Sequence, residues 1–107
     1  MATTGRTRLL FSGTAAAAGS TVAVQRVGNI YGTVQCDFTT SSALGFKMEI
    51  QGRIGEALNW AILGTIDETD IDDNNAALLS VRLLPEMRAE VTSVTGSVGT
   101  ITAHLLE

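Results

Sequence analysis

A single cysteine, a single proline and a single histidine occur among the 107 residues of this sequence. The lone cysteine, Cys36, cannot form a disulfide within the chain, and the absence of a Cys/His cluster excludes a structural zinc site. No apolar run approaches the ~20 residues of a transmembrane helix, so we expect no membrane partner. The fold must therefore rest on its packing, to which partner subunits can contribute.

Charged residues are scarce too, because they make up 17 % of the chain, against about 25 % in typical soluble domains. Seven Lys and Arg stand against 11 Asp and Glu, and the basic residues form no stripe. We therefore expect no nucleic-acid partner. A low charge suits a chain that covers part of its surface with neighbouring subunits.

Residues with catalytic chemistry are few and form no set. The only histidine, His104, lies in the polar phase of a predicted strand, whereas Cys36 lies in an apolar phase. A nucleophile needs a base that a third group orients, and general acid–base catalysis needs a matched acid and base. The sequence supplies neither, and it has no GxGxxG or GxxxxGK[ST] motif. We expect no catalytic residues, no cofactor and no enzyme activity.

What the sequence does contain is repeated alternation of apolar and polar residues, the pattern of half-buried β-strands. It is clearest over residues 30–38 and recurs over 22–24, 46–51, 58–62, 79–83, 87–91 and 101–105. Over 76–84 a single helical turn followed by a strand is the alternative. Seven or eight short strands predict one all-β domain over 21–107, an antiparallel β-sandwich of jelly-roll or immunoglobulin-like type. Its expected core anchors are Phe38, Phe46, Trp60 and Val91.

Residues 1–20 differ from this pattern, because they combine two arginines with many small residues. We predict an N-terminal arm that includes a first edge strand. Large apolar side chains are costly to expose, and a free strand edge is a template for association. We therefore expect a partner interface made of Arg6, Arg8, Leu9, Leu10 and Phe11.

Acidic residues cluster between residues 67 and 75. Their oxygen atoms are the ligands that Ca²⁺ prefers, but the EF-hand spacing with its central glycine and final glutamate is missing. Such loops are commonly solvated turns, and a contact with a basic patch on a partner is a further reading. We assign no metal site, and the weak calcium candidates are Asp67, Asp70, Asp72, Asp73 and Asn74.

The order of features over residues 20–107 resembles that of small β-sandwich virion structural proteins of tailed phages. The resemblance rests on an early alternating strand, on the stretch QGRIGEALNWAILGTI at 51–66 with its hairpin and Asn-Trp, and on MRAEVT at 87–92. The chain departs from the pattern at 56–58, where Glu-Ala-Leu stands in place of Asp-Gly before the tryptophan.

The resemblance implies a capsid decoration or cement protein on the capsid surface of the virion. Such a protein would stabilise the head by bridging subunits of the major capsid protein, or would bind another virion protein. It would work as a homo-oligomer, with a trimer favoured, and the family has no catalytic residues to carry over. Weak contacts repeated over a lattice give high avidity.

A tail- or fibre-associated binding module, recognising carbohydrate or depending on Ca²⁺, is the alternative. It would need a concave site rimmed by aromatic and polar groups. Apart from Tyr31 and Trp60 the sequence offers few rings for such a site. A small hydrolase is a third class, and it lacks a recognisable catalytic set.

Overall fold

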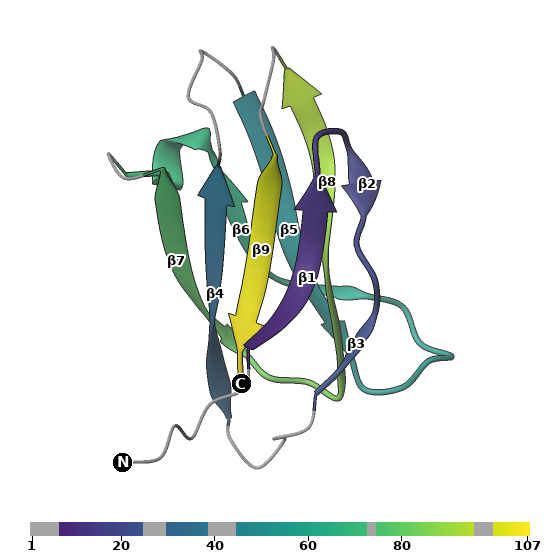
Figure 1. The fold of residues 1–107 in the computed structure, drawn as a ribbon. Helices are drawn as coiled ribbons and strands as arrows, with labels where there is room; N and C mark the ends of the chain where they lie inside the picture. The colour runs from purple at the N-terminus through teal and green to yellow at the C-terminus, as the bar shows by residue number, and fades with distance from the viewer. Residues whose placement is uncertain (1–6, 25–29, 39–44, 73–74, 96–99) are drawn as a thin grey trace, which may run out of the picture.

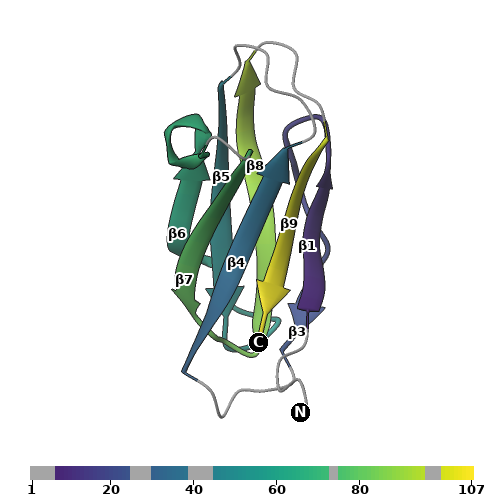
Figure 2. The ribbon, with the colours of Figure 1, turned by 60° about the vertical axis from the view of Figure 1, so that its left-hand side comes forward.

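The computed structural model describes residues 7–24, 30–38, 45–72, 75–95 and 100–107. These residues form two antiparallel sheets that pack face to face, as Figures 1 and 2 show. The predicted β-sandwich is thereby confirmed. Among the described residues no helix is long and apolar enough to cross a membrane.

One sheet has four strands and the other has five. The four-stranded sheet has the order β1 (Thr7–Gly13), β9 (Ile101–Leu106), β4 (Tyr31–Phe38) and β7 (Ala76–Arg82). The five-stranded sheet has the order β2 (Ala17–Ala18), β8 (Glu86–Thr95), β5 (Gly45–Arg53) and β6 (Ala61–Asp67), while β3 (Val22–Ala23) also pairs with β8. A short 3-10 helix, η1 (Glu68–Asp70), follows β6.

The core lies between the sheets and follows the alternation in the sequence. On β9 the side chains of Ile101, Ala103 and Leu105 are fully buried, and those between them face outward. The same alternation buries Val34 and Cys36 on β4. The core also holds Phe46 and Val91, which are 2 % and 1 % exposed. The side chain of Phe38 lies outside the described residues. Apolar burial on this scale is the main stabilising contribution to the fold.

The N-terminal strand β1 is an edge strand of the chain's own sandwich and pairs with β9. A register shift between Leu9 and Phe11 interrupts the alternation, so that the consecutive residues Leu10 and Phe11 are both buried, at 1 % and 5 % exposure. This corrects the expectation that these two side chains contact a partner, because they fill the chain's own core. Arg6 lies outside the described residues.

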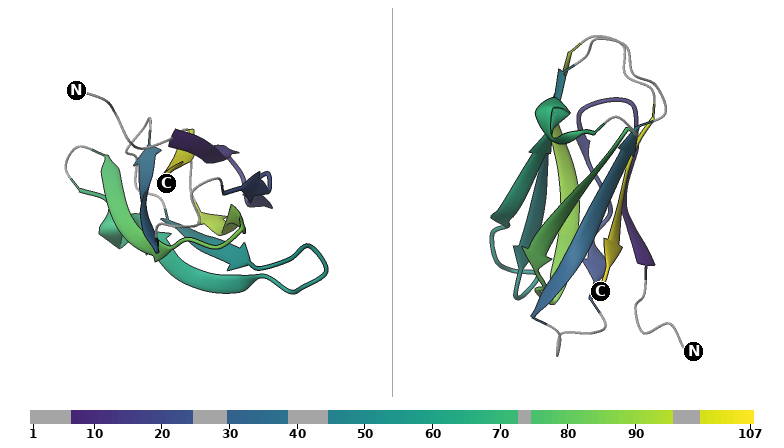
Figure 3. Two further views of the ribbon diagram at one scale, coloured as in Figure 1. Left: turned by 90° about the horizontal axis from the view of Figure 1, so that it is seen from below. Right: turned by 90° about the vertical axis from the view of Figure 1, so that its left-hand side faces the viewer.

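The connection between β5 and β6 is longer than expected. The alternation predicted a return strand from residue 58, but β6 begins at Ala61, and residues 54–60 form a loop that projects to one side of the sandwich (Figures 1 and 3). Trp60 therefore precedes the strand and is half-buried outside the core. This corrects its assignment as a core anchor. Residues 76–82 form strand β7, without the helical turn considered for this segment.

Candidate functional site

The two sheets present outer faces of different chemistry. Strands β5 and β8 of the five-stranded sheet carry a set of ionic and amide side chains that we call the charged face: Glu49, Gln51, Arg53, Glu86, Arg88 and Glu90. The four-stranded sheet carries what we call the low-charge face: Thr7, Leu9, Tyr31, Thr33, Gln35, Asp37, Leu78, Ser80, Arg82, Thr102, His104 and Leu106. Only Asp37 and Arg82 on the low-charge face are formally charged.

The polar groups of the charged face satisfy one another through Gln51, which is only 5 % exposed. Its side-chain Oε1 accepts a hydrogen bond from Arg88 Nε at 2.6 Å. Its Nε2 donates to Glu49 and to Glu90 at 3.0 Å each. Glu49 and Glu90 lie directly opposite each other on the two strands, where like charges repel. Gln51 therefore separates two carboxylates by donating to both.

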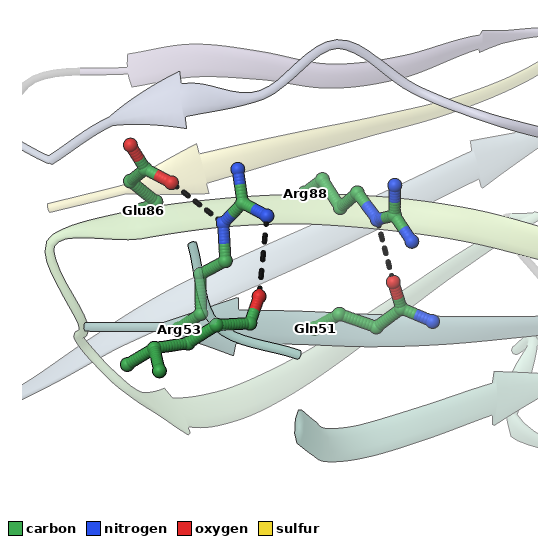
Figure 4. A network of polar contacts seen from close by, with 5 residues as sticks. Gln51, Arg53, Glu86 and Arg88 are labelled. Carbon is green, nitrogen blue, oxygen red and sulfur yellow. Dashed lines mark hydrogen bonds and ion pairs between the residues drawn. The ribbon is translucent and has the colours of Figure 1, made fainter. Parts of the chain in front are cut away.

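A second pair of opposite residues extends this network toward the β5–β6 loop. Arg53 Nε donates to Glu86 Oε1 at 2.6 Å, and the Arg53 guanidinium also donates to the carbonyl oxygen of Leu58 at 3.3 Å. Figure 4 shows the Arg53–Glu86 and Arg88–Gln51 contacts side by side along β5 and β8. The bond to Leu58 ties the base of the loop to the sheet.

Trp60 lies against both arginines of the network. The guanidinium carbons of Arg53 and Arg88 are 4.1 Å and 4.5 Å from the centroid of its ring, within the range of a cation–π contact. The alternation predicted a core anchor at Trp60, whereas in the structure its ring packs on the two arginines of the polar network. Both guanidinium groups have acidic or amide partners and an aromatic neighbour, so neither is free to attract an anion, whereas Lys47 on the same side of β5 is exposed.

The low-charge face is different, because it exposes large apolar side chains. Leu9, Tyr31, Leu78 and Leu106 are 51 %, 64 %, 69 % and 47 % exposed. A shallow hollow of about 450 Å³ lies on this face, and its lining consists of Thr7, Thr33, Gln35, Asp37, Leu78, His104 and Leu106. Exposed apolar clusters on a soluble protein commonly mark a contact surface.

The patterns in the sequence did not indicate most of this surface. Of the residues expected at a partner interface, only Leu9 lies on it. Arg8 is directed to the end of the sandwich, where it pairs with Glu107 at 3.2 Å and donates to the carbonyl oxygen of Ala23 at 2.9 Å. The available signal was an apolar residue in the outward phase of a strand, as at Leu78 and Leu106.

The structure separates the two residues considered for nucleophilic chemistry. Gln35 pairs with His104 across β4 and β9, and Cys36 pairs with Ala103. Because neighbouring residues on a strand point to opposite faces, Cys36 points into the core while His104 lies on the outer face. Burial, with a smaller effect of the Asp37 carboxylate, raises the pKa of the Cys36 thiol to about 12. The two side chains therefore do not form a Cys–His pair.

The acidic segment builds turns with its carboxylates. Asp67 caps η1 by accepting a hydrogen bond from Thr69 N at 2.8 Å, and Asp70 accepts one from Asp67 N at 2.9 Å. The bonds from Thr69 and the bond from the backbone of Asp70 lower the pKa of Asp67. Asp72 accepts a bond from Ala76 N at 3.2 Å. Asp73 and Asn74 lie outside the described residues, and the residues described form no group of three or more metal-ligating side chains.

No protein-family model matches the chain, and no curated protein matches it. A search of solved structures found a similar fold in the crystal structure of the SPBc2 prophage-derived protein YomS. The TM-score is 0.61 at 17 % sequence identity, and the match covers 96 % of this chain and 93 % of that chain. The likeness therefore extends over nearly the whole of both chains, and at this identity it concerns the fold.

Proposed function

We propose that the chain is a structural protein of a tailed-phage virion that binds the capsid surface as a decoration or cement protein. The observation that carries the proposal is the likeness in fold to a prophage-derived protein over 96 % of the chain. The order of sequence features over residues 20–107 supports the same class of protein. A fold alone hosts many functions, so the surfaces must supply the rest of the support.

The role would be mechanical. A sandwich of two sheets packed on one core supplies a rigid body, and the hydrogen-bonded charged face suits contact with water. Attachment to the major capsid protein would use the β5–β6 loop, which projects from the body and exposes Ile54 at 68 % and Leu58 at 50 %. One such contact is weak, but a small oligomer that binds several capsid subunits at once gains avidity.

The separation of Cys36 from His104 supports a function without covalent catalysis, because a thiol in the core has no base beside it. The aromatic side chains also favour a structural role over carbohydrate binding. Tyr31 lies on the low-charge face, while Trp60 lies against the two arginines of the charged face. The two rings are therefore not arranged as the shared platform that the alternative binding module would need.

Purified particles test the proposal. Virions are prepared from the genome that encodes the chain, with and without its gene, and the copy number of the chain is measured against that of the major capsid protein. We expect a copy number that scales with the capsid subunits, and we expect heads without the chain to release DNA at a lower temperature. Absence from the particles, or a few copies located on the tail, would contradict the decoration role.

A loop variant tests the attachment. Purified chain carrying Ile54→Asp and Leu58→Asp is added to heads that lack the chain, and binding is measured by co-sedimentation. We expect the loop variant to lose binding while Thr65→Asp, an exposed change on neighbouring β6, retains it. Equal binding by both variants would place the attachment elsewhere on the molecule.

A further inference from the structure

We infer that the low-charge face is the contact surface for a second copy of this chain, with the two copies related by a two-fold axis. Such a pair would form whether or not the chain belongs to a virion. It would leave the charged face and the β5–β6 loop free, because both belong to the opposite sheet. A two-fold pair would stand in place of the trimer expected from the family resemblance.

The apolar content of this face is the first reason. Four of the large apolar side chains that the described residues expose, Leu9, Tyr31, Leu78 and Leu106, lie together on one sheet. The residues between them are mostly neutral Thr, Ser and Gln, which can be covered at a smaller desolvation cost than charged groups. Strands β5 and β8 expose no comparable side chain among the described residues, and the exposed Ile54, Leu58 and Ile62 lie in the β5–β6 loop and on β6.

The positions of the two charges are the second reason. Arg82 lies opposite Tyr31 at one end of the β4–β7 pair, and Asp37 lies opposite Ala76 at the other end. The six residue steps from Tyr31 to Asp37 separate the two ends by about 20 Å of strand. The Arg82 side chain has no hydrogen bond or ion pair with the part of the chain that the structure describes.

A two-fold axis in the plane of the face, perpendicular to the strands, exchanges the two ends of the sheet. It therefore brings Arg82 of each copy toward Asp37 of the other, and two reciprocal ion pairs form at once. Each pair would join β7 of one copy to β4 of the other, and these strands are neighbours in the sheet. A two-fold interface requires this self-complementarity, in which each residue meets the same partner in both directions.

The area of the low-charge face limits how tightly two copies can bind each other. Four strands spaced by ~4.8 Å, each about seven residues long, give a face of roughly 450 Å² per copy. A standard stable interface covers about 800 Å² per partner. We therefore expect a weak pair that dissociates on dilution, rather than a permanent dimer.

The charge pattern allows a sharp test by sedimentation equilibrium over a wide concentration range. The unaltered chain should move from 11.2 kDa toward twice that mass as its concentration rises. R82D and D37R should each weaken self-association at least about tenfold, because every ion pair becomes a like-charge contact. A 1:1 mixture of R82D with D37R should associate again, since both contacts in the mixed pair join opposite charges.

The matched apolar variants are Leu78→Asp on the low-charge face and Leu58→Asp on the loop of the other sheet. We expect the first to abolish association and the second to leave it unchanged, with both variants showing the same circular dichroism as the unaltered chain. A monomer at every concentration would overturn the inference, as would failure of the mixture to associate. A mass of three copies would overturn the two-fold arrangement and favour a trimer.

Discussion

The charged face and the low-charge face lie on opposite sides of one core, but they differ in how many of their polar side chains have partners within the chain. On the charged face, Gln51 and Arg53 connect acidic and basic groups of two strands within the same chain. On the low-charge face, the described residues form one hydrogen bond between side chains, from Gln35 to Asp37 at 3.0 Å. One face is complete as it stands, and the other offers apolar area and two separated charges.

This difference shows how a small sandwich can distribute stability and recognition. Cross-strand pairs stabilise a sheet when the opposite side chains interact, and the pairs between β5 and β8 do so on the charged face. The low-charge face gives up such pairs, because Leu78 lies opposite Gln35 and Leu106 lies opposite Thr33. Its side chains therefore remain available to a partner.

The largest expected effect comes from adjacent leucines on β1. Leu10 is buried in the core while Leu9 is 51 % exposed on the low-charge face. We expect Leu10→Ala to lower the free energy of unfolding by about 2–5 kcal/mol through lost burial and a cavity. Leu9→Ala should change it by no more than about 0.5 kcal/mol. Urea unfolding at low protein concentration measures both, and equal effects would contradict the position of the bulge in β1.

Removal of residues 1–13 also tests whether β1 belongs to the core of the chain's own sandwich. It takes away all of β1 with Leu10 and Phe11, so we expect a chain that no longer unfolds cooperatively. Removal of residues 1–6 is the control, since the described sandwich begins at Thr7. If the longer deletion also folded normally, β1 would be dispensable for the sandwich, as expected of an arm that contacts a partner.

We expect a smaller change in the free energy of unfolding when two glutamines, one on each face, are replaced. Gln51 is 5 % exposed and bonds to three charged residues, whereas Gln35 is exposed and bonds to Asp37 alone. We expect Gln51→Ala to cost about 1–3 kcal/mol, because it leaves half-buried charged groups without their partner. Gln35→Ala should stay within about 0.5 kcal/mol. Thermal unfolding of both variants at pH 7 checks the difference, and a neutral Gln51→Ala would mean that the network contributes no stability.

Much of the sandwich could be predicted from alternation alone. Where one face of a strand is buried, a period of two residues decides which side chains enter the core, and it placed Val34, Cys36, Met87, Ala89 and Leu105 correctly. The fold class followed from the number and spacing of such segments. The positions of Phe46 and Val91 in the core have the same origin.

Three features of the structure could not be predicted from the sequence, each for a physical reason. The bulge at Leu10 adds a residue to one strand of a pair, and nothing in a run of apolar residues marks where that occurs. The place of Trp60 depended on the length of the β5–β6 loop, which the alternation of Leu58, Trp60 and Ile62 concealed. The low-charge face depends on the pairing of β1, β9, β4 and β7 in one sheet, which brings Leu9, Leu78 and Leu106 to one surface.

A comparison of thiol reactivity concerns the two sides of strand β4. Cys36 is fully buried and its pKa is raised to about 12 by burial, so the folded chain should not react with a disulfide reagent at pH 8. A cysteine introduced by Gln35→Cys, in a Cys36→Ala background, should react at once because that position faces solvent. If the two copies pair through the low-charge face, this reaction should slow as the protein concentration rises, which dilution reverses.

The Cys36 thiol makes the free energy of unfolding depend on pH, and the sign of this dependence follows from the raised pKa of the thiol. The unfolded chain ionises Cys36 near its ordinary pKa of about 8.5 and the folded chain does so only near 12. Its contribution to stability is therefore complete below about pH 8.5 and is lost as the pH rises toward 12. Relative to Cys36→Ala, the unaltered chain should lose about 0.8 kcal/mol between pH 7 and pH 9. Urea unfolding of both chains at these two pH values measures the loss, and a constant difference would mean that the thiol ionises as readily in the folded chain as in the unfolded one.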